Sequence, residues 1–387
     1  MISRDLLSVV RFAISGGGVP EINDWDSLMA DVRTHAIIPI LFLIKDRINV
    51  PEKVIKQIKT EQYKYLAQNT SVMREQQKVV DALENQGIIP FILKGSALAQ
   101  YYDIPKSRTV GDIDLLVADE EKFNTAIKEI LKLGFYPMEE YGEMNFKNSL
   151  DSGFRHYEFK KNNIEVELHS TYTKTQSPVE IYLEESEPVE RHIESLRFHS
   201  FSDIGNGLVI LQHINYHLAA AGIGLRLLID WAYYVKNILT DVFWDYEFRE
   251  VAERCGFLKL AVCLTRVCEM YFEIGSHKYS ECADDALCED FMQLVLESGN
   301  FGRNRTITSR KSSEVKADNL LRNVQNKGLS ESKAIQKYKV LQPFAWVYGL
   351  YLYTYQVLKS DKGIRETIKG QKYGKKIKKI QMALEIS

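Results

Sequence analysis

Two short runs of alternating apolar and acidic residues constrain this chain most. Residues 111–117 read Gly-Asp-Ile-Asp-Leu-Leu-Val, and residues 164–169 read Ile-Glu-Val-Glu-Leu-His. A β-strand repeats every two residues, so Asp112 and Asp114 point to one face while the apolar residues point to the other, toward a core. Glu167 belongs to the polar face of the second run. If the two predicted strands are neighbours, these three carboxylates converge on one spot.

Clustered carboxylates are costly because they repel one another unless a cation neutralises them. Hard oxygen ligands of this kind suit Mg²⁺, which proteins usually hold through one or two carboxylates plus substrate phosphates. The sequence therefore predicts a divalent-cation site where Asp112, Asp114 and Glu167 meet. Glu165 has the same parity as Glu167 but lies earlier in the strand, so we expect it to be solvated.

The composition is that of a soluble globular protein, with 387 residues, 45% of them apolar and 26% charged. The net charge of −2 provides no global field toward nucleic acid or membrane. An early acid at the N-terminus argues against a signal peptide, and no apolar stretch reaches the ~18 residues of a membrane helix. Five cysteines without a Cys-x-x-Cys pair favour reduced thiols in the cytoplasm over disulfides or a structural zinc site.

Hydrophobic periodicity predicts an α+β protein whose small mixed β-sheet core is flanked by helices on both sides. Residues 1–85 form an N-terminal helical segment that ends in a long amphipathic helix, residues 86–200 an α/β core, and residues 201–387 a C-terminal helical domain. Within the core, the expected strands cover residues 87–93, 113–117, 135–138, 154–159 and 164–168, and the expected helices cover residues 96–102 and 120–133.

Three features of the C-terminal part have a plain structural interpretation. The polar residues 299–333 are expected to form a loop, and residues 344–358 an aromatic-rich helix. Its aromatic stripe indicates core or interface rather than a base-stacking platform. The lysines of the tail indicate a solvated helix face rather than a nucleic-acid contact; they are Lys369, Lys372, Lys375, Lys376, Lys378 and Lys379.

Taken in order, the motifs carry a family signature. Residues 93–99 read Leu-Lys-Gly-Ser-Ala-Leu-Ala, Arg108 precedes the Gly-Asp-Ile-Asp run, and residues 166–169 read Val-Glu-Leu-His. This combination resembles the bacterial "uncharacterised nucleotidyltransferase" family of the polymerase-β-like nucleotidyltransferase superfamily. The resemblance covers roughly residues 20–240, with Glu167 standing where Asp is common.

The resemblance implies a nucleotidyltransferase, which moves an NMP from an NTP such as ATP to an acceptor hydroxyl or phosphate and releases pyrophosphate. Such enzymes use two divalent ions, here Mg²⁺ with Mn²⁺ as the alternative. By resemblance, Asp112 and Asp114 would bridge both ions. Glu167 would hold the acceptor-side ion and could help to deprotonate the acceptor.

The same resemblance makes Lys94, Gly95, Ser96 and Arg108 the candidate nucleotide-binding residues. Gly95 lets the backbone approach the triphosphate because it lacks a Cβ, and Ser96 can donate its N–H and hydroxyl to a phosphate at a helix N-terminus. Lys94 either reaches a phosphate or is bonded to the strand end. Arg108 either clamps phosphate oxygens or forms an ion pair that fixes its loop to an acid.

Five further residues match the pattern of the family without a settled role. His169 either lines the site or is a hydrogen-bonded structural histidine. His213 and His217 have the i, i+4 spacing of a metal site, but without an adjacent Glu we expect a packed helix interface. Arg226 and Asp230 are also spaced to pair with each other on one helix face.

The acceptor is expected to be a small molecule or a protein side chain, because the near-neutral charge disfavours a nucleic acid without excluding it. Membrane partners are not expected. Two rival interpretations stay open at this point. One is a catalytically silent relic of the same fold that binds a nucleotide or a partner. The other is a toxin-type nucleotidyltransferase that acts on tRNA or protein and needs the basic tail.

Overall fold

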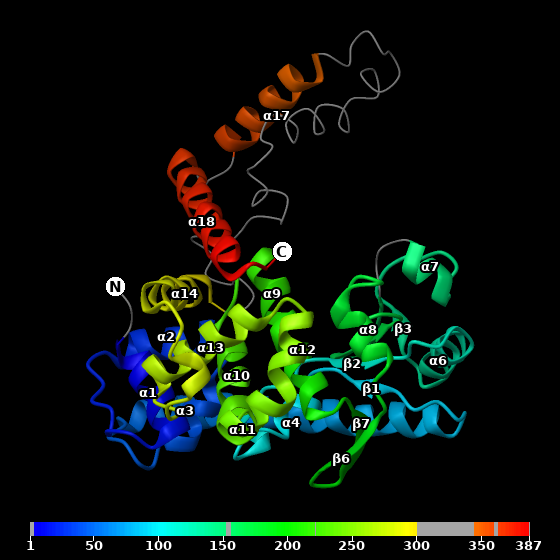
Figure 1. Cartoon of the computed structure of the whole chain (residues 1–387), viewed down its shortest axis with the longest axis horizontal. Coiled ribbons are helices and arrows are strands. Elements are labelled where there is room, and N and C mark those ends of the chain that lie inside the picture. Colours follow the sequence, from blue (N-terminus) through cyan, green and yellow to red (C-terminus); the bar gives the residue numbers. More distant parts are fainter. Residues whose placement is uncertain (1–3, 152–155, 221, 300–343, 360–362, 387) are drawn as a thin grey trace.

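The computed structural model describes residues 4–151, 156–220, 222–299, 344–359 and 363–386. It opens with helices α1 (Arg4–Ser15), α2 (Trp25–Thr34), α3 (Ile38–Ile44) and α4 (Glu52–Glu84). The side chain of Asp24 caps α2 by accepting a hydrogen bond from the Ser27 N–H. Helix α4 is 33 residues long and runs beneath both the helical part and the sheet (Figure 1).

A mixed sheet of seven strands follows, in the order β3-β4-β5-β2-β1-β7-β6. The pairs β2–β5 and β1–β7 are parallel and the remaining pairs are antiparallel. The strands are β1 (Phe91–Ile92), β2 (Ile113–Leu116), β3 (Tyr136–Pro137), β4 (His156–Lys161), β5 (Ile164–His169), β6 (Val189–Ile193) and β7 (Leu196–Ser200). This mixed sheet between helical segments confirms the predicted fold class.

One strand prediction needs correction, one is untested in part, and one hairpin was not predicted. The strand expected over residues 87–93 shrinks to Phe91–Ile92, since Pro90 lacks the N–H that a ladder position requires. The start expected for β4, residues 154 and 155, lies outside the described residues. The hairpin of β6 and β7 was missed. Its first strand carries Arg191 on the same face as Val189 and Ile193, which hides the apolar alternation.

Short helices and turns join the strands of the sheet. They are α5 (Ser96–Ala99), a 3₁₀ turn (Pro105–Ser107), α6 (Glu120–Lys132), α7 (Phe146–Asp151) and α8 (Pro178–Glu184). Helix α6 follows its prediction closely because Asp119 caps its start and Gly134, at φ +87°, follows its end. Val79 and Val80 of α4 and Phe123 of α6 pack with the apolar side chains of the sheet in one core.

The rest of the described chain is helical. It comprises α9 (Asp203–Ala220), α10 (Leu225–Asn237), α11 (Asp241–Phe243), a π-helical turn (Trp244–Phe248), α12 (Arg249–Arg254), α13 (Leu258–Phe272), a 3₁₀ turn (Lys278–Ser280), α14 (Asp285–Ser298), α17 (Ala345–Lys359) and α18 (Gly363–Leu384). Side chains of α1–α3 share a second core with those of α10, α13 and α14, and these helices lie together in Figure 1. The division of the chain into three domains stays a prediction.

The C-terminal features differ from their predictions in part. The expected loop over residues 299–333 lies outside the described residues from residue 300 onward. The predicted aromatic helix exists as α17. Trp346, Leu350 and Tyr351 are exposed, so these residues are not part of a core, and the interface interpretation of the stripe stays a prediction. Two further findings are plain. All five cysteines are free thiols, and no helix among the described residues is long and apolar enough to span a membrane.

Candidate functional site

The three predicted carboxylates meet at the centre of the sheet. Strands β2 and β5 run side by side in parallel, with Asp114 directly opposite Glu167, and Asp112 immediately precedes β2. Oxygen atoms of the three side chains lie within 4.8 Å of one another. Ile113 and Leu115 alternate with the acids and are buried in the core on the other face. The convergence that the strand period predicts is therefore present.

A lysine ammonium lies beside these acids. Lys94 Nζ is 2.6 Å from Asp114 Oδ1 and 4.0 Å from Glu167 Oε2. Burial opposes its charge, but the carboxylates of Asp114, Glu167 and Asp112 outweigh burial and raise the pKa of Lys94. Of the two alternatives for this residue, the structure shows the second, in which Lys94 is bonded to the protein itself, here through an ion pair with Asp114.

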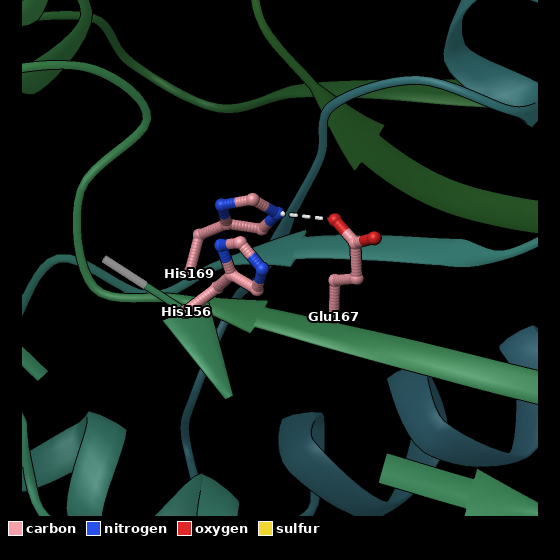
Figure 2. Close-up of side chains that lie close together, drawn as sticks. All are labelled: His156, Glu167 and His169. Carbon is pink, nitrogen blue, oxygen red and sulfur yellow. Dashed lines mark hydrogen bonds and ion pairs between the residues drawn. The ribbon is translucent and has the colours of Figure 1, made fainter. Parts of the chain in front are cut away.

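Two histidines adjoin Glu167, one of which the sequence singled out (Figure 2). His169 Nε2 lies 3.2 Å from Glu167 Oε2 and 3.5 Å from Asp114 Oδ1. Burial lowers the pKa of His169, but hydrogen bonds to Asp114 and Glu167 outweigh burial and raise it. The ring of His156 packs against that of His169, with 4.7 Å between centroids.

His156 is a site residue that sequence reasoning missed. The two-residue turn at Asn162–Asn163 pairs Lys161 with Ile164, and this register brings His156 opposite His169. A turn placed at these two asparagines, with Asn162 at φ +55°, would have revealed the pair. Burial and the neighbouring His169 lower the pKa of His156.

The Gly95–Ser96 corner has one feature as expected and one that differs. Gly95 adopts φ +54°, and a Cβ there would lie 3.2 Å from Val110 Cγ1, so glycine suits this position. Ser96 is fully buried, and its hydroxyl donates a hydrogen bond to Gln76 Oε1 of α4 at 2.9 Å. The expected donation from this hydroxyl to a phosphate is therefore not available in this arrangement, because the side chain anchors α5 to α4.

Arg108 forms the ion pair that was its alternative interpretation. Its Nε and Nη2 donate to the two oxygens of Asp230 at 2.7 and 2.9 Å, and its Nη1 donates to the Gly95 carbonyl at 3.1 Å. Asp230 also accepts a hydrogen bond from the Tyr102 hydroxyl at 2.7 Å. Arg108 thus ties the Gly95 corner to α10. Arg226, which was expected to pair with Asp230, places Nη1 3.4 Å from Thr109 Oγ1.

A cavity of about 390 Å³ opens over the acids, between the sheet and helices α9 and α10. His213 and His217 of α9 line it, with 2.9 Å between their Nε2 atoms, where the sequence favoured a packed helix interface. Burial lowers the pKa of both, to about 4 for His217. Arg226 also lines the cavity, and burial together with the charge of Arg108 lowers its pKa.

Comparison with known protein families shows which family the chain belongs to. Residues 21–273 match the family described as uncharacterised nucleotidyltransferase. The chain belongs to this family. No curated protein and no solved structure matches the chain. Membership in a nucleotidyltransferase family gives the chain a general role in nucleotidyl transfer, and the matched region contains every site residue described above.

The acids of this family member fit a divalent cation, which nucleotidyltransferases generally use. Asp114 Oδ2 is buried without a hydrogen-bond partner among the described residues. The charge of Asp114 and burial raise the pKa of Asp112. Burial also acts to raise the pKa of Glu167, but the hydrogen bond from His169 and the charge of Lys94 outweigh it and lower that pKa to about 2. A buried oxygen without a partner and mutual repulsion between acids are what a bound cation relieves.

Proposed function

We propose that this protein transfers an NMP from an NTP to a hydroxyl or phosphate of a small-molecule or protein acceptor, with Mg²⁺ as its ion. The observation that carries the proposal is the convergence of Asp112, Asp114 and Glu167 from two neighbouring strands beside the Gly95 corner. The family match supports the class of reaction. The free thiols favour a reducing compartment such as the cytoplasm.

Nucleotidyl transfer depends on positioning and charge neutralisation, because the acceptor oxygen must approach the α-phosphorus in line with the leaving pyrophosphate. Bound divalent ions would supply that neutralisation at the triphosphate and the acceptor. Asp112 and Asp114 would hold ions on the nucleotide side, and Glu167 on the acceptor side. With its pKa lowered to about 2, Glu167 is a weak base, which favours a role as ligand over a role as proton acceptor.

The cavity supports binding of the nucleotide over the acids. Its volume of about 390 Å³ lies in the range of small-ligand sites. Lys94, Arg108 and Arg226 line it, so three cationic residues surround the space where a triphosphate would lie. The flexible stem of Lys94 would let its ammonium turn from Asp114 to a phosphate once an ion neutralises the acids.

One observation favours the silent alternative. Lys94 neutralises Asp114 without any ion, as a residue of a relic site could do. The toxin-type alternative gains less support from the basic tail, because Lys379 lies 3.1 Å from Asp290 and Lys376 lies 3.9 Å from Glu297, both on α14.

Pyrophosphate release tests the proposal, measured with each NTP, Mg²⁺ and a panel of hydroxyl and phosphate acceptors. Glu167→Gln should lower the rate of pyrophosphate release by about tenfold to a hundredfold, since it removes a proposed ligand. Glu165→Gln is the matched control on the same strand, because Glu165 faces Lys160 at 2.7 Å and does not line the cavity. Equal rates in the two variants would contradict the proposal. Mg²⁺-dependent NTP binding without release for any acceptor would favour the silent alternative.

A further inference from the structure

Two imidazoles and a carboxylate form a second group of metal-ligating atoms in the cavity. One ligand atom each from His156, Glu167 and His169 lies within 4.8 Å of the other two. Both rings turn a nitrogen toward the Glu167 carboxylate (Figure 2). The three residues stand on β4 and β5, which pair directly with His156 opposite His169. Neighbouring strands of one sheet hold such ligands more rigidly than loops would.

We propose that His156, His169 and Glu167 bind a transition-metal ion, such as Mn²⁺ or Zn²⁺, beside the carboxylate site. Imidazole nitrogen suits transition metals, whereas Mg²⁺ takes oxygen ligands almost entirely. Two histidines and one glutamate are also a ligand set that leaves a position open on Zn²⁺ for a further ligand.

The burial of the group fits an ion that enters from the cavity. His169 is buried, and its Nε2 faces Glu167 Oε2 at 3.2 Å. The side chains of His156 and Glu167 are 30% and 25% exposed and line the cavity. They can therefore adjust by small rotations around an entering ion.

The surroundings are mixed in charge. Glu158 Oε1 lies 3.4 Å from His156 Nε2, so this carboxylate can orient the ring or join the ligands. The ammonium of Lys94 would repel a cation bound here. Its Nζ lies 4.0 Å from Glu167 Oε2, however, and is closer to Asp114, at 2.6 Å. Glu167 itself and its acidic neighbours Glu158, Asp112 and Asp114 outnumber that one ammonium.

Glu167 belongs to both groups, so an ion here would adjoin the ion held by Asp112 and Asp114. In that respect the inference rests on the proposed function, and it names the class of the second ion. Binding of the metal itself requires no turnover. It can therefore be tested without a nucleotide or an acceptor.

The test uses the full chain after chelation of all metals, titrated with Co²⁺, Zn²⁺ or Mg²⁺ alone. Binding is followed by calorimetry for each ion and by visible absorption for Co²⁺. His156→Gln should weaken Co²⁺ and Zn²⁺ binding by at least tenfold and leave Mg²⁺ binding unchanged. His192→Gln is the matched control, a histidine of another strand that also faces a glutamate two residues away, Glu190 at 3.0 Å, outside the cavity. This control should bind all three ions as the unaltered protein does.

Equal Co²⁺ and Zn²⁺ affinity in His156→Gln and the unaltered protein would overturn the site. If that variant does not fold, magnetic resonance of Mn²⁺ or Cu²⁺ bound to the unaltered protein decides, because directly bound imidazole nitrogen gives its own coupling. Absence of nitrogen coupling would overturn the site, and its presence would support it. Failure of the proposed function can be distinguished from failure of this site. Asp112→Asn can abolish Mg²⁺-dependent NTP binding while Co²⁺ binding to the histidines persists.

Discussion

The ammonium of Lys94 supplies, within the chain itself, part of the positive charge that the acids of the site require. Asp114 is almost fully buried, and a lone carboxylate in such a place would lose much of its solvation free energy. Lys94 offsets this loss with an ion pair at 2.6 Å. The same position beside Asp114 is where a divalent cation is expected, so the lysine and the ion compete for one carboxylate.

Lys94→Met should therefore destabilise the protein in the absence of metal, by about 3–5 kcal/mol, because it leaves Asp114 buried without its partner. Added Mg²⁺ should restore part of that loss. Urea denaturation with and without Mg²⁺ measures both effects. Lys106→Met is the control, since the pair of Lys106 with Glu194 is exposed and its loss should change stability by no more than about 1 kcal/mol. No added stabilisation by Mg²⁺ in Lys94→Met, relative to the unaltered protein, would contradict this account.

The Arg108–Asp230 pair has a structural role that also predicts a measurable loss. Asp230→Asn should lower the free energy of unfolding by about 3–5 kcal/mol, because it leaves the buried Arg108 guanidinium without its counter-charge. Asp103→Asn is a matched control, since the Asp103–Lys236 pair is far more exposed and should contribute no more than about 1 kcal/mol. Chemical denaturation of both variants tests this, and equal losses would show that the buried pair has no special weight.

The acids of the site could be predicted from the sequence, whereas several of their neighbours could not. Strand parity alone puts Asp112 and Asp114 on one face, so only the pairing of β2 with β5 had to be assumed. The partners of Ser96 and Arg108 are different, because Gln76 and Asp230 lie on helices far along the chain. No local pattern reports such long-range hydrogen bonds, so Ser96 was assigned to phosphate, and the choice between a phosphate clamp and an ion pair stayed open for Arg108.

At the scale of elements, one buried histidine joins the N-terminal helices to the helix that carries Arg226 and Asp230. His35 ends α2, and its Nδ1 accepts a hydrogen bond from the Leu225 N–H at the start of α10. Burial lowers the pKa of His35 from 6.5 to about 4. The unfolded chain therefore takes up this proton at a higher pH than the folded protein does.

The sign of the pH effect follows from that difference. The contribution of neutral His35 to stability should be complete above about pH 6.5 and should be lost as the pH falls toward 4, by about 3 kcal/mol in total. His35→Asn keeps an acceptor for the Leu225 N–H without the titrating ring, so its stability should change less over this range. Urea unfolding at pH 7, 5.5 and 4 tests this, with the exposed His192→Asn as control. If the free energy of unfolding changed with pH to the same extent in His35→Asn and in the unaltered protein, His35 would not be the source of this pH dependence.

Element boundaries were predicted best where caps and period agree. Helix α4 ends within two residues of its prediction, and α6 ends at Lys132 just before Gly134. The hairpin of β6 and β7 was missed because Arg191 occupies an inward position of its first strand. Its guanidinium lies 2.9 Å from Asp203 Oδ1. This ion pair lets a charged residue occupy a position where the alternation pattern predicts an apolar one.

At the scale of the whole molecule, the site lies over two hydrophobic cores that α4 joins. Val54 and Ile58 of this helix belong to the core of the helical part, and Val79 and Leu83 belong to the core beneath the sheet. The cavity opens where the sheet faces α9 and α10. A single helix that spans both cores keeps the acids on the sheet in a fixed relation to Arg226 on α10.

The C-terminal helix contributes to stability at a place remote from the cavity. Ile380 of α18 is fully buried in the helical core, whereas Met382 on the same helix is exposed. Ile380→Ala should cost about 2–5 kcal/mol of stability, and Met382→Ala should change it little. Neither should alter NTP affinity, because neither residue lines the cavity. Denaturation and calorimetric nucleotide titration of both variants test this, and weaker NTP binding in a folded Ile380→Ala variant would count against the separation of the two regions.

The central claim is that acids from β2 and β5 jointly hold the cation that binds the nucleotide. Its most direct test is calorimetric titration of Mg²⁺ and NTP into the unaltered protein, the double variant Asp112→Asn/Asp114→Asn and the control Glu165→Gln. We expect Mg²⁺-dependent NTP binding in the unaltered protein and the control, and its loss in the double variant. Unchanged binding of Mg²⁺ and NTP by a folded double variant would contradict the account.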